Sequence, residues 1–418
     1  MKLICKLALA LTIPALFLSC KTKATKKVII WTSHPEFVSY SELFNATHNN
    51  VKAVVIYKDE VARALPPAKD EIKPDIIIGS WLKNSSTRKF FQPLDYMFQE
   101  GTLSRPAFYS QLIQYGSINE KQYLLPVSFN LPLMIFNKKN EVLIGTEHTL
   151  NLEQIKNVSG SFNKQTKTGT FTSMGYAPSW DPDFIYLASR MGGSSYFEKG
   201  ISFMYDKEAL KATIDNLRNW TTEKNKDTTT EQNFQFKYLY MPKYKQVTTG
   251  RCLLASTTSN YFFTLNDAQS SNISFRWIEQ NSKIPVEEDL ITMGIYKNAL
   301  HTNEAEKFIA WFMKSETQET LIKRNESMNL DTVKFGIANG FSSIKEVNEK
   351  SYPASYRQLL GNLPPEESIS LPNILPARWE SLKSRVILPF LVDSTNTSVE
   401  QPELSLEDRI SEWTKQYY

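Results

Sequence analysis

Residues 122–138, QYLLPVSFNLPLMIFNK, contain two short apolar runs, 123–129 and 133–136, which Pro126 and Pro132 interrupt. Proline cannot donate a hydrogen bond to a sheet, so we expect these strands at a sheet edge or at a bend where the chain crosses between two units. Uncharged Ser128 and Asn130 stand beside the aliphatic residues, which suits a strand that leaves a core and enters a cleft. An ordinary edge strand of a single-domain α/β protein would show the same pattern.

The length and composition of the chain indicate a globular protein of more than one unit. A chain of 418 residues is too long for one comfortable core, so two lobes are expected. The net charge is only +4 and the lysines are scattered along the chain, so no nucleic-acid partner is predicted.

The N-terminus has the features of an export signal. Lysines flank the start, an apolar run covers residues 7–18, and Ser19 precedes Cys20. The run is too short to span a bilayer but is typical of a secretory signal peptide. The end of this run, up to Ser19 and Cys20, resembles a bacterial lipobox. We therefore expect a signal peptide over 1–19, and a lipidated Cys20 with a polar tether over 20–27. A plain signal peptide with a chance cysteine is the alternative.

If Cys20 is lipidated, the mature protein has a single free thiol, so no internal disulfide can form. The other cysteines are Cys5, inside the signal, and Cys252, inside the apolar run 252–255. We expect Cys252 to pack as a small hydrophobic residue.

The first part of the chain is typical of a parallel α/β sheet. Apolar runs at 28–31, 51–57 and 75–78 predict strands, and a helix with a capping box at Ser39 and Glu42 lies between the first two. Ligands of such sheets bind beyond the carboxyl ends of the strands. One rim is therefore predicted to hold five candidate binding residues: Trp31, Ser33, His34, Ser80 and Trp81.

A second unit follows residue 150. We expect a strand over 168–173, a loop over 174–181 and a helix that Gly192 and Gly193 stop. A further helix should start after Asp206, and the polar, threonine-rich segment 221–232 should be a surface loop.

Four landmarks in order resemble the maltose-binding-like extracellular solute-binding proteins of ABC importers. These are the strand and Pro-Asp motif of residues 28–78, the crossover at 122–138, the glycine and short strand at 250–261, and the Gly-apolar-x-Lys-Asn run at 294–298 with its amphipathic helix. The resemblance implies an α/β, two-lobed periplasmic-binding-protein fold of type II, with mixed sheets flanked by helices around a hinged cleft. It also implies a first lobe of residues 28–130 plus about 296–355 and a second of 131–295 plus about 356–418, the last segment being uncertain.

The resemblance also nominates ligand contacts in the second lobe and at the crossover. Asn130 and Asp181 would bond solute hydroxyls, while Trp180, Tyr261 and Trp379 would offer aromatic faces. Three of them have a plainer alternative. Tyr261 suits a strand–helix turn, Trp379 a core position, and Asp181 a turn or helix cap.

Motifs for common catalytic and metal chemistry are absent from the sequence. It contains no phosphate loop, no H-E-x-x-H, no C-x-x-C and no G-x-S-x-G, and its four histidines lack metal-ligand spacing. A pair of distant carboxylates for glycoside hydrolysis stays open, but nothing nominates one. We expect no enzyme activity, no metal and no cofactor.

The sequence therefore predicts a monomeric, lipid-anchored solute-binding protein on the outer side of a bacterial membrane. It would capture a small solute, most simply a carbohydrate, and deliver it to the membrane subunits of an ABC permease. The alternative is a surface lipoprotein of the same fold that binds a macromolecule or a non-sugar ligand such as a polyamine.

Overall fold

The computed structural model describes residues 25–200, 202–238, 240–327, 334–399, 402 and 404–417. The predicted signal peptide and the predicted lipid attachment at Cys20 lie outside these residues. The tether predicted for residues 20–27 must end before residue 26, because strand β1 (Lys26–Thr32) already pairs with its neighbour at Lys26.

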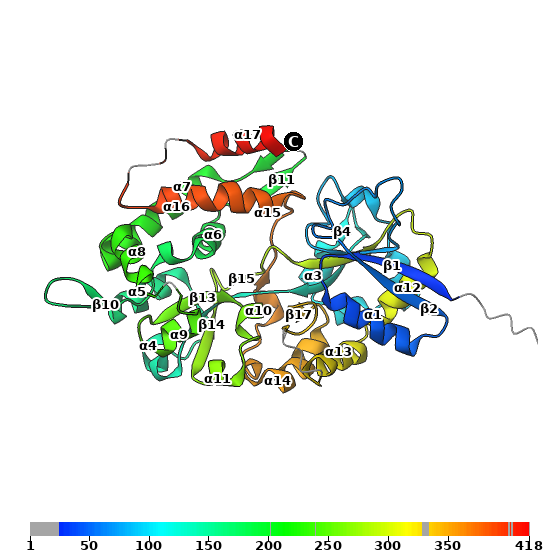
Figure 1. The fold of residues 1–418 in the computed structure, drawn as a ribbon, viewed down its shortest axis with the longest axis horizontal. Coiled ribbons are helices and arrows are strands. Elements are labelled where there is room, and N and C mark those ends of the chain that lie inside the picture. Colours follow the sequence, from blue (N-terminus) through cyan, green and yellow to red (C-terminus); the bar gives the residue numbers. More distant parts are fainter. Residues whose placement is uncertain are drawn as a thin grey trace, which may run out of the picture.

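The first lobe is built on a six-stranded mixed sheet (Figure 1). Its parallel strands confirm the α/β prediction, since β1 pairs in parallel with both β2 and β3. The remaining three strands are antiparallel to their neighbours. In spatial order the strands are β17 (Phe341–Ser342), β6 (Leu125–Phe129), β16 (Ile291–Ile295), β3 (Ile76–Gly79), β1 and β2 (Val51–Tyr57).

Helices cover the first sheet through aromatic side chains. Phe37, Tyr40 and Phe44 of α1 pack against Phe308 and Phe312 of α12. The stripe predicted for the helix after residue 302 is therefore core packing. The α-helices of this lobe are α1 (Glu36–Thr47), α2 (Asp95–Gln99), α3 (Ser110–Tyr115), α12 (Thr302–Phe312), α13 (Ser315–Ser327) and α14 (Tyr352–Ser355).

The second lobe contains a four-stranded sheet in the order β13 (Leu254–Thr258), β7 (Pro132–Asn137), β14 (Ile273–Ile278) and β8 (Thr149–Leu150). Its α-helices are α4 (Glu141–Ile144), α5 (Leu152–Phe162), α6 (Pro182–Met191), α7 (Lys207–Trp220), α8 (Thr228–Phe236), α9 (Lys243–Thr248), α10 (Ser259–Phe262) and α11 (Asp267–Ser270). The C-terminal helices α15 (Trp379–Leu382), α16 (Leu388–Thr395) and α17 (Leu406–Tyr417) join this lobe, where α16 packs on α6 and α7 (Figure 1).

The two lobes share an aromatic core on one side of the molecule. Phe263 of the second lobe stacks on Phe335 at 4.9 Å between ring centroids, and Trp277 meets Phe341 at 6.0 Å. The division into the predicted residue ranges remains our proposal. A boundary between the lobes is hardest to draw at this shared core, because side chains of both lobes pack together there.

Two local predictions are wrong. Helix α1 begins at Glu36, so Ser39 lies inside the helix and cannot form the predicted capping box. Residues 221–232 are not a surface loop: they form a π-helix (Thr221–Asn225) and the start of α8. Buried polar contacts hold this segment, because Asn225 Nδ2 donates to Glu231 Oε1 at 2.7 Å.

The described part of the chain has no helix that is long and apolar enough to cross a membrane. Cys252 is buried and packs with Phe171, Met174 and Phe234, which confirms its predicted role as a small hydrophobic residue.

Candidate ligand-binding site

The two sheets meet end to end where the chain crosses between the lobes. Phe129 still pairs with Phe341 in the first sheet, whereas Pro132 already pairs with Thr258 in the second. The chain returns through residues 286–290, which run from β15 (Ile284–Pro285) to the first-lobe strand β16. A site between the lobes therefore has the ends of β1, β3 and β13 as its walls.

The predicted first-lobe rim exists. Strands β1 and β3 are parallel, with Thr32 opposite Ile78, so the residues that follow them share one edge. Ser33 and His34 are half-buried there, and Ser80 donates its hydroxyl to the backbone oxygen of Asp289 at 2.6 Å. This bond fixes the rim against the returning crossover segment.

Trp31 and His34 are poor solute platforms in this conformation. Trp31 is fully buried, and the ammonium of Lys58 lies 4.4 Å from the centre of its ring. No face of the indole is open, so contact with a solute would need rearrangement. Burial, and next the charge of Lys334, lower the pKa of His34 to about 4, so its imidazole is neutral at neutral pH.

Trp81 reaches from the first lobe to the second. Its φ is +57°, a left-handed conformation that costs a bulky residue energy. Its half-buried ring packs against the hydrophobic cluster of the second lobe. Four residues later, the backbone N–H of Ser85 donates to Glu198 Oε1 at 2.7 Å. The loop after β3 therefore touches both lobes.

A cavity of about 650 Å³, called here the lobe-2 cavity, lies where β13 approaches the crossover. It combines hydroxyl, amide, aromatic and charged side chains. Its lining is Pro132, Asp181, Asp183, Tyr186, Leu187, Arg190, Gln235, Met241, Pro242, Lys243, Gln246, Ser256, Thr257, Thr258, Tyr261, Glu287 and Lys383. Two of the predicted residues, Asp181 and Tyr261, are brought together in it.

Asp181 has two structural tasks in this cavity. Its side chain caps α6 by accepting a hydrogen bond from the backbone of Asp183, as the helix-cap alternative predicted. Its other oxygen accepts from Lys243 Nζ at 2.6 Å, and Lys243 also donates to the backbone oxygen of Ser256. Tyr261 is less engaged, with 38% of its surface exposed.

The other predicted second-lobe residues are occupied by packing. The ring of Trp180 stacks on Phe234 at 5.7 Å, and its Nε1 donates to the backbone oxygen of Glu231. Trp379 is 1% exposed, so the core alternative describes it best. Trp180 and Trp379 therefore contribute to the shape of the second lobe rather than to an open surface.

Asn130 links the lobes. Its Oδ1 accepts from the hydroxyl of Ser259 at 2.7 Å, and its Nδ2 donates to the backbone oxygen of Asn339 at 3.0 Å. Both ends of the amide are used inside the protein, so Asn130 holds the crossover in this conformation.

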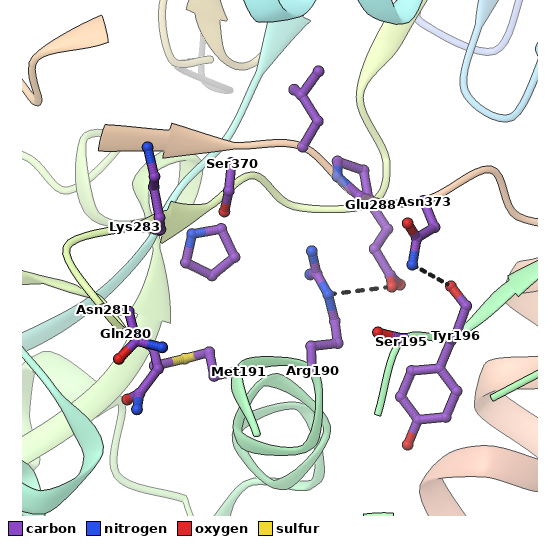
Figure 2. Close-up of a pocket in the computed structure, with 13 residues that line it drawn as sticks. Arg190, Met191, Ser195, Tyr196, Gln280, Asn281, Lys283, Glu288, Ser370 and Asn373 are labelled. Carbon is purple, nitrogen blue, oxygen red and sulfur yellow. Dashed lines mark hydrogen bonds and ion pairs between the residues drawn. The ribbon is translucent and has the colours of Figure 1, made fainter. Parts of the chain in front are cut away.

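A smaller cavity of about 260 Å³ also borders the returning crossover at Glu288, and Arg190 lines both cavities. Figure 2 shows Arg190 pointing toward Glu288 within it, and the Nε of Arg190 lies 3.5 Å from Glu288 Oε1. Glu288 also accepts from the hydroxyl of Tyr186 and, at 2.7 Å, from Trp379 Nε1. Glu287 lines the larger cavity and Glu288 the smaller one.

Sequence reasoning missed the charged residues Lys243, Glu287, Arg190 and Lys383. They come from four separate elements, so no spacing in the sequence brings them together. One signal was available: the acidic run Glu287, Glu288 and Asp289 immediately precedes the buried strand β16. Within the described residues, no group of histidine, cysteine and acidic side chains has the arrangement of a metal site.

Comparison with known proteins gives one family and one fold. The model of a family described as bacterial extracellular solute-binding protein matches residues 28–319. No protein among those with curated descriptions matches the chain.

Solved structures of similar fold cover nearly the whole chain at low sequence identity. CpMnBP1 with mannotriose bound has a TM-score of 0.64 at 15% identity, covering 93% of this chain and 99% of its own. The GacH receptor of Streptomyces glaucescens, solved unliganded and with acarbose, has a TM-score of 0.62 at 12% identity, covering 94% and 99%. The maltose-binding periplasmic protein MalE of Listeria monocytogenes, in complex with maltose, has a TM-score of 0.60 at 13% identity, with the same coverage. These similarities establish the two-lobed fold.

Proposed function

Because this chain belongs to the family of bacterial extracellular solute-binding proteins, we propose that it is a lipid-anchored protein that captures a carbohydrate between its lobes. It delivers this solute to the membrane subunits of an ABC permease. Cys20 carries the lipid, and residues 21–25 separate the folded domain from the membrane on its extracytoplasmic side.

The observation that carries the proposal is the lobe-2 cavity at the sheet end nearest the first lobe. Its volume of about 650 Å³ lies within the range of small-molecule sites. Tyr261 offers a partly exposed ring for the apolar face of a sugar, and Thr257 and Ser256 stand beside it for hydroxyls. Three similar folds were solved with mannotriose, acarbose and maltose, which supports a carbohydrate.

The mechanism is a shift between open and closed lobes. A solute held by the lobe-2 cavity gains contacts with the first-lobe rim only when the lobes close, and those added contacts supply the preference for the closed state. The loop of Ser80 and Trp81 already spans the gap, so it is the first-lobe element best placed to complete the site.

A panel of mono-, di- and oligosaccharides, polyamines and peptides tests the proposal on the soluble chain from Lys21 onward. A solute at about a hundred times its dissociation constant adds roughly 2.7 kcal/mol to the free energy of unfolding, which raises the melting temperature measurably. The variant Tyr261→Ala should abolish the rise. Tyr240→Ala is the matched control, because Tyr240 is 96% exposed and lies outside the cavity lining.

Each other outcome has a clear meaning. If polyamines alone raise the melting temperature, carbohydrate capture is wrong and the solute is a cation. If nothing in the panel acts on folded protein, small-solute capture is wrong, and a macromolecular ligand takes its place.

A further inference from the structure

The lining of the lobe-2 cavity has three cationic and three acidic side chains, but with Glu288, which lies outside the lining and faces Arg190, the acidic side chains exceed the cationic ones by one. Each of its three cationic side chains already faces a carboxylate: Lys243 Nζ lies 2.6 Å from Asp181, Lys383 Nζ 3.1 Å from Asp183, and Arg190 Nε 3.5 Å from Glu288. The pair of Arg190 and Glu288 is the most enclosed, with side chains 13% and 5% exposed. Counting these pairs leaves one charged residue in the lining, Glu287.

Glu287 is fixed by its backbone and open at its carboxyl group. Its N–H donates to the backbone oxygen of Asn130 at 2.9 Å, so the residue is held against the other crossover. Across the described part of the chain, no side chain or backbone group forms a hydrogen bond or ion pair with its carboxylate. The carboxylate is half-buried and lines the cavity.

The groups around Glu287 do not remove this excess charge. Arg190 of α6 is used by Glu288 and donates to the backbone oxygen of Val286 at 2.9 Å. Lys383, which follows α15, is paired with Asp183 and lies 4.4 Å from the centre of the Tyr186 ring. On its own segment Glu287 has Glu288 and Asp289 as neighbours, which repel its charge.

Closure of the lobes makes the unpaired carboxylate more costly. Removing the remaining water from a carboxylate without a counter-charge is strongly unfavourable, whereas an ammonium group placed beside it forms a charge-assisted hydrogen bond. A neutral sugar hydroxyl would not compensate the charge, so the carboxyl group would have to stay charged at this cost or take up a proton, whereas an ammonium group stabilises the charged form. Burial already raises the pKa of Glu287 to about 7, with Arg190 and Lys383 acting in the opposite direction.

We propose that Glu287 is the residue that determines solute specificity, and that the solute is an amino-bearing carbohydrate whose ammonium group pairs with its carboxylate. This inference rests on the proposed capture of a carbohydrate in the same cavity. It assigns Tyr261 to the ring of the solute and Glu287 to the amino group.

Matched sugars test the inference by isothermal titration calorimetry on the soluble chain. Glucosamine and its β-1,4-linked oligomers carry the ammonium group, and the N-acetylated counterparts keep the ring and lose the charge. We expect the amino sugars to bind about tenfold or more tightly than the N-acetyl sugars at pH 7. In Glu287→Gln the ratio should fall to about two or less.

Two further variants separate charge from shape. Glu287→Asp keeps the charge and should retain most of the preference, even if Glu287→Gln proves poorly folded. Glu316→Gln removes the same charge from the exposed face of α13 and should leave the ratio unchanged. Proton release gives an independent readout: at pH 7 the binding heat should depend on the buffer, because the fractionally protonated Glu287 gives up its proton when the ammonium binds.

Two results would overturn the inference in different ways. If glucose or N-acetylglucosamine oligomers bind as tightly as the amino sugars and Glu287→Gln changes neither, carbohydrate capture stands and the role of Glu287 is wrong. If no sugar of either kind binds to folded protein, the proposed function itself fails.

Discussion

Glu288 joins two helices of the second lobe, α6 and α15, to the returning crossover, and its replacement by glutamine should destabilise the protein strongly. One carboxylate oxygen accepts from the Tyr186 hydroxyl and faces Arg190, and the other accepts from Trp379 Nε1. Glutamine has the same shape but offers one oxygen and one NH₂ group. The NH₂ group must therefore face either Trp379 Nε1 or Arg190, both of which can only donate, and Arg190 loses its buried counter-charge.

The expected cost follows from the burial of the pair. Removing one partner of a buried ion pair costs roughly 3–5 kcal/mol, because the remaining charge stays buried without compensation. With an m-value of about 3 kcal/mol/M, the midpoint of urea unfolding should fall by roughly 1–1.7 M. Unfolding is followed by tryptophan fluorescence and by circular dichroism.

A surface pair provides the control. Lys323 and Glu319 form an i,i+4 pair on α13 with side chains 69% and 44% exposed. Such pairs contribute about 0.3–0.5 kcal/mol, so Glu319→Gln should shift the midpoint by less than about 0.2 M. If the midpoint of Glu288→Gln lies within about 0.3 M of this control, Glu288 is not a buried counter-charge and the reasoning is wrong.

Three more predictions concern the first-lobe rim. Trp81→Ala should increase the radius of gyration of the solute-free protein in small-angle X-ray scattering, because the indole is a contact between the lobes; unchanged scattering would contradict this. Trp81→Gly should be more stable than Trp81→Ala by roughly 1 kcal/mol, since glycine tolerates a φ of +57°. The pKa of His34, about 4, lies below its ordinary value of 6.5, so the unfolded chain takes up the proton first and stability is lost as the pH falls from 6.5 toward 4. In His34→Gln the melting temperature should fall less between pH 6.5 and pH 4 than in the unchanged protein. An equal fall in the two proteins would contradict this prediction.

The sequence was informative where local pattern determines structure. The prolines at 126 and 132 indicated the crossover, and the spacing of Phe308 and Phe312 indicated a helix that faces the core. Asp181 and Tyr261 were nominated through the resemblance and the chemistry of sugar sites, and both line the lobe-2 cavity.

Burial of the tryptophans was not readable from the sequence. Both faces of β1 are covered, Ile30 on one and Trp31 on the other, so the alternation that marks a half-exposed strand is missing. Trp379 has the same difficulty, since its ring is enclosed by Tyr196 and Phe203, two residues from a distant hairpin. Composition alone cannot distinguish an aromatic platform from an aromatic core.

The prediction of a surface loop at residues 221–232 was wrong for a different reason. Its threonine, asparagine and glutamate residues suggest a loop because they are polar, but Glu231 is fully buried and accepts from the hydroxyl of Ser179 and the amide of Asn225. A polar sequence forms a helix here because other residues provide hydrogen-bond partners for its buried polar side chains. Such partners are visible only in three dimensions.

The crossover segment 286–290 separates stability from binding within two adjacent residues. The chain turns at Glu288, and the two side chains line different cavities: Glu287 lines the larger one and Glu288 the smaller one. Glu288 forms an ion pair with Arg190, whereas no described residue forms an ion pair with Glu287. The same substitution, glutamate to glutamine, should therefore destabilise the fold at 288 and alter solute preference at 287. If the two variants behaved alike, the side-by-side assignment of these carboxylates would be wrong.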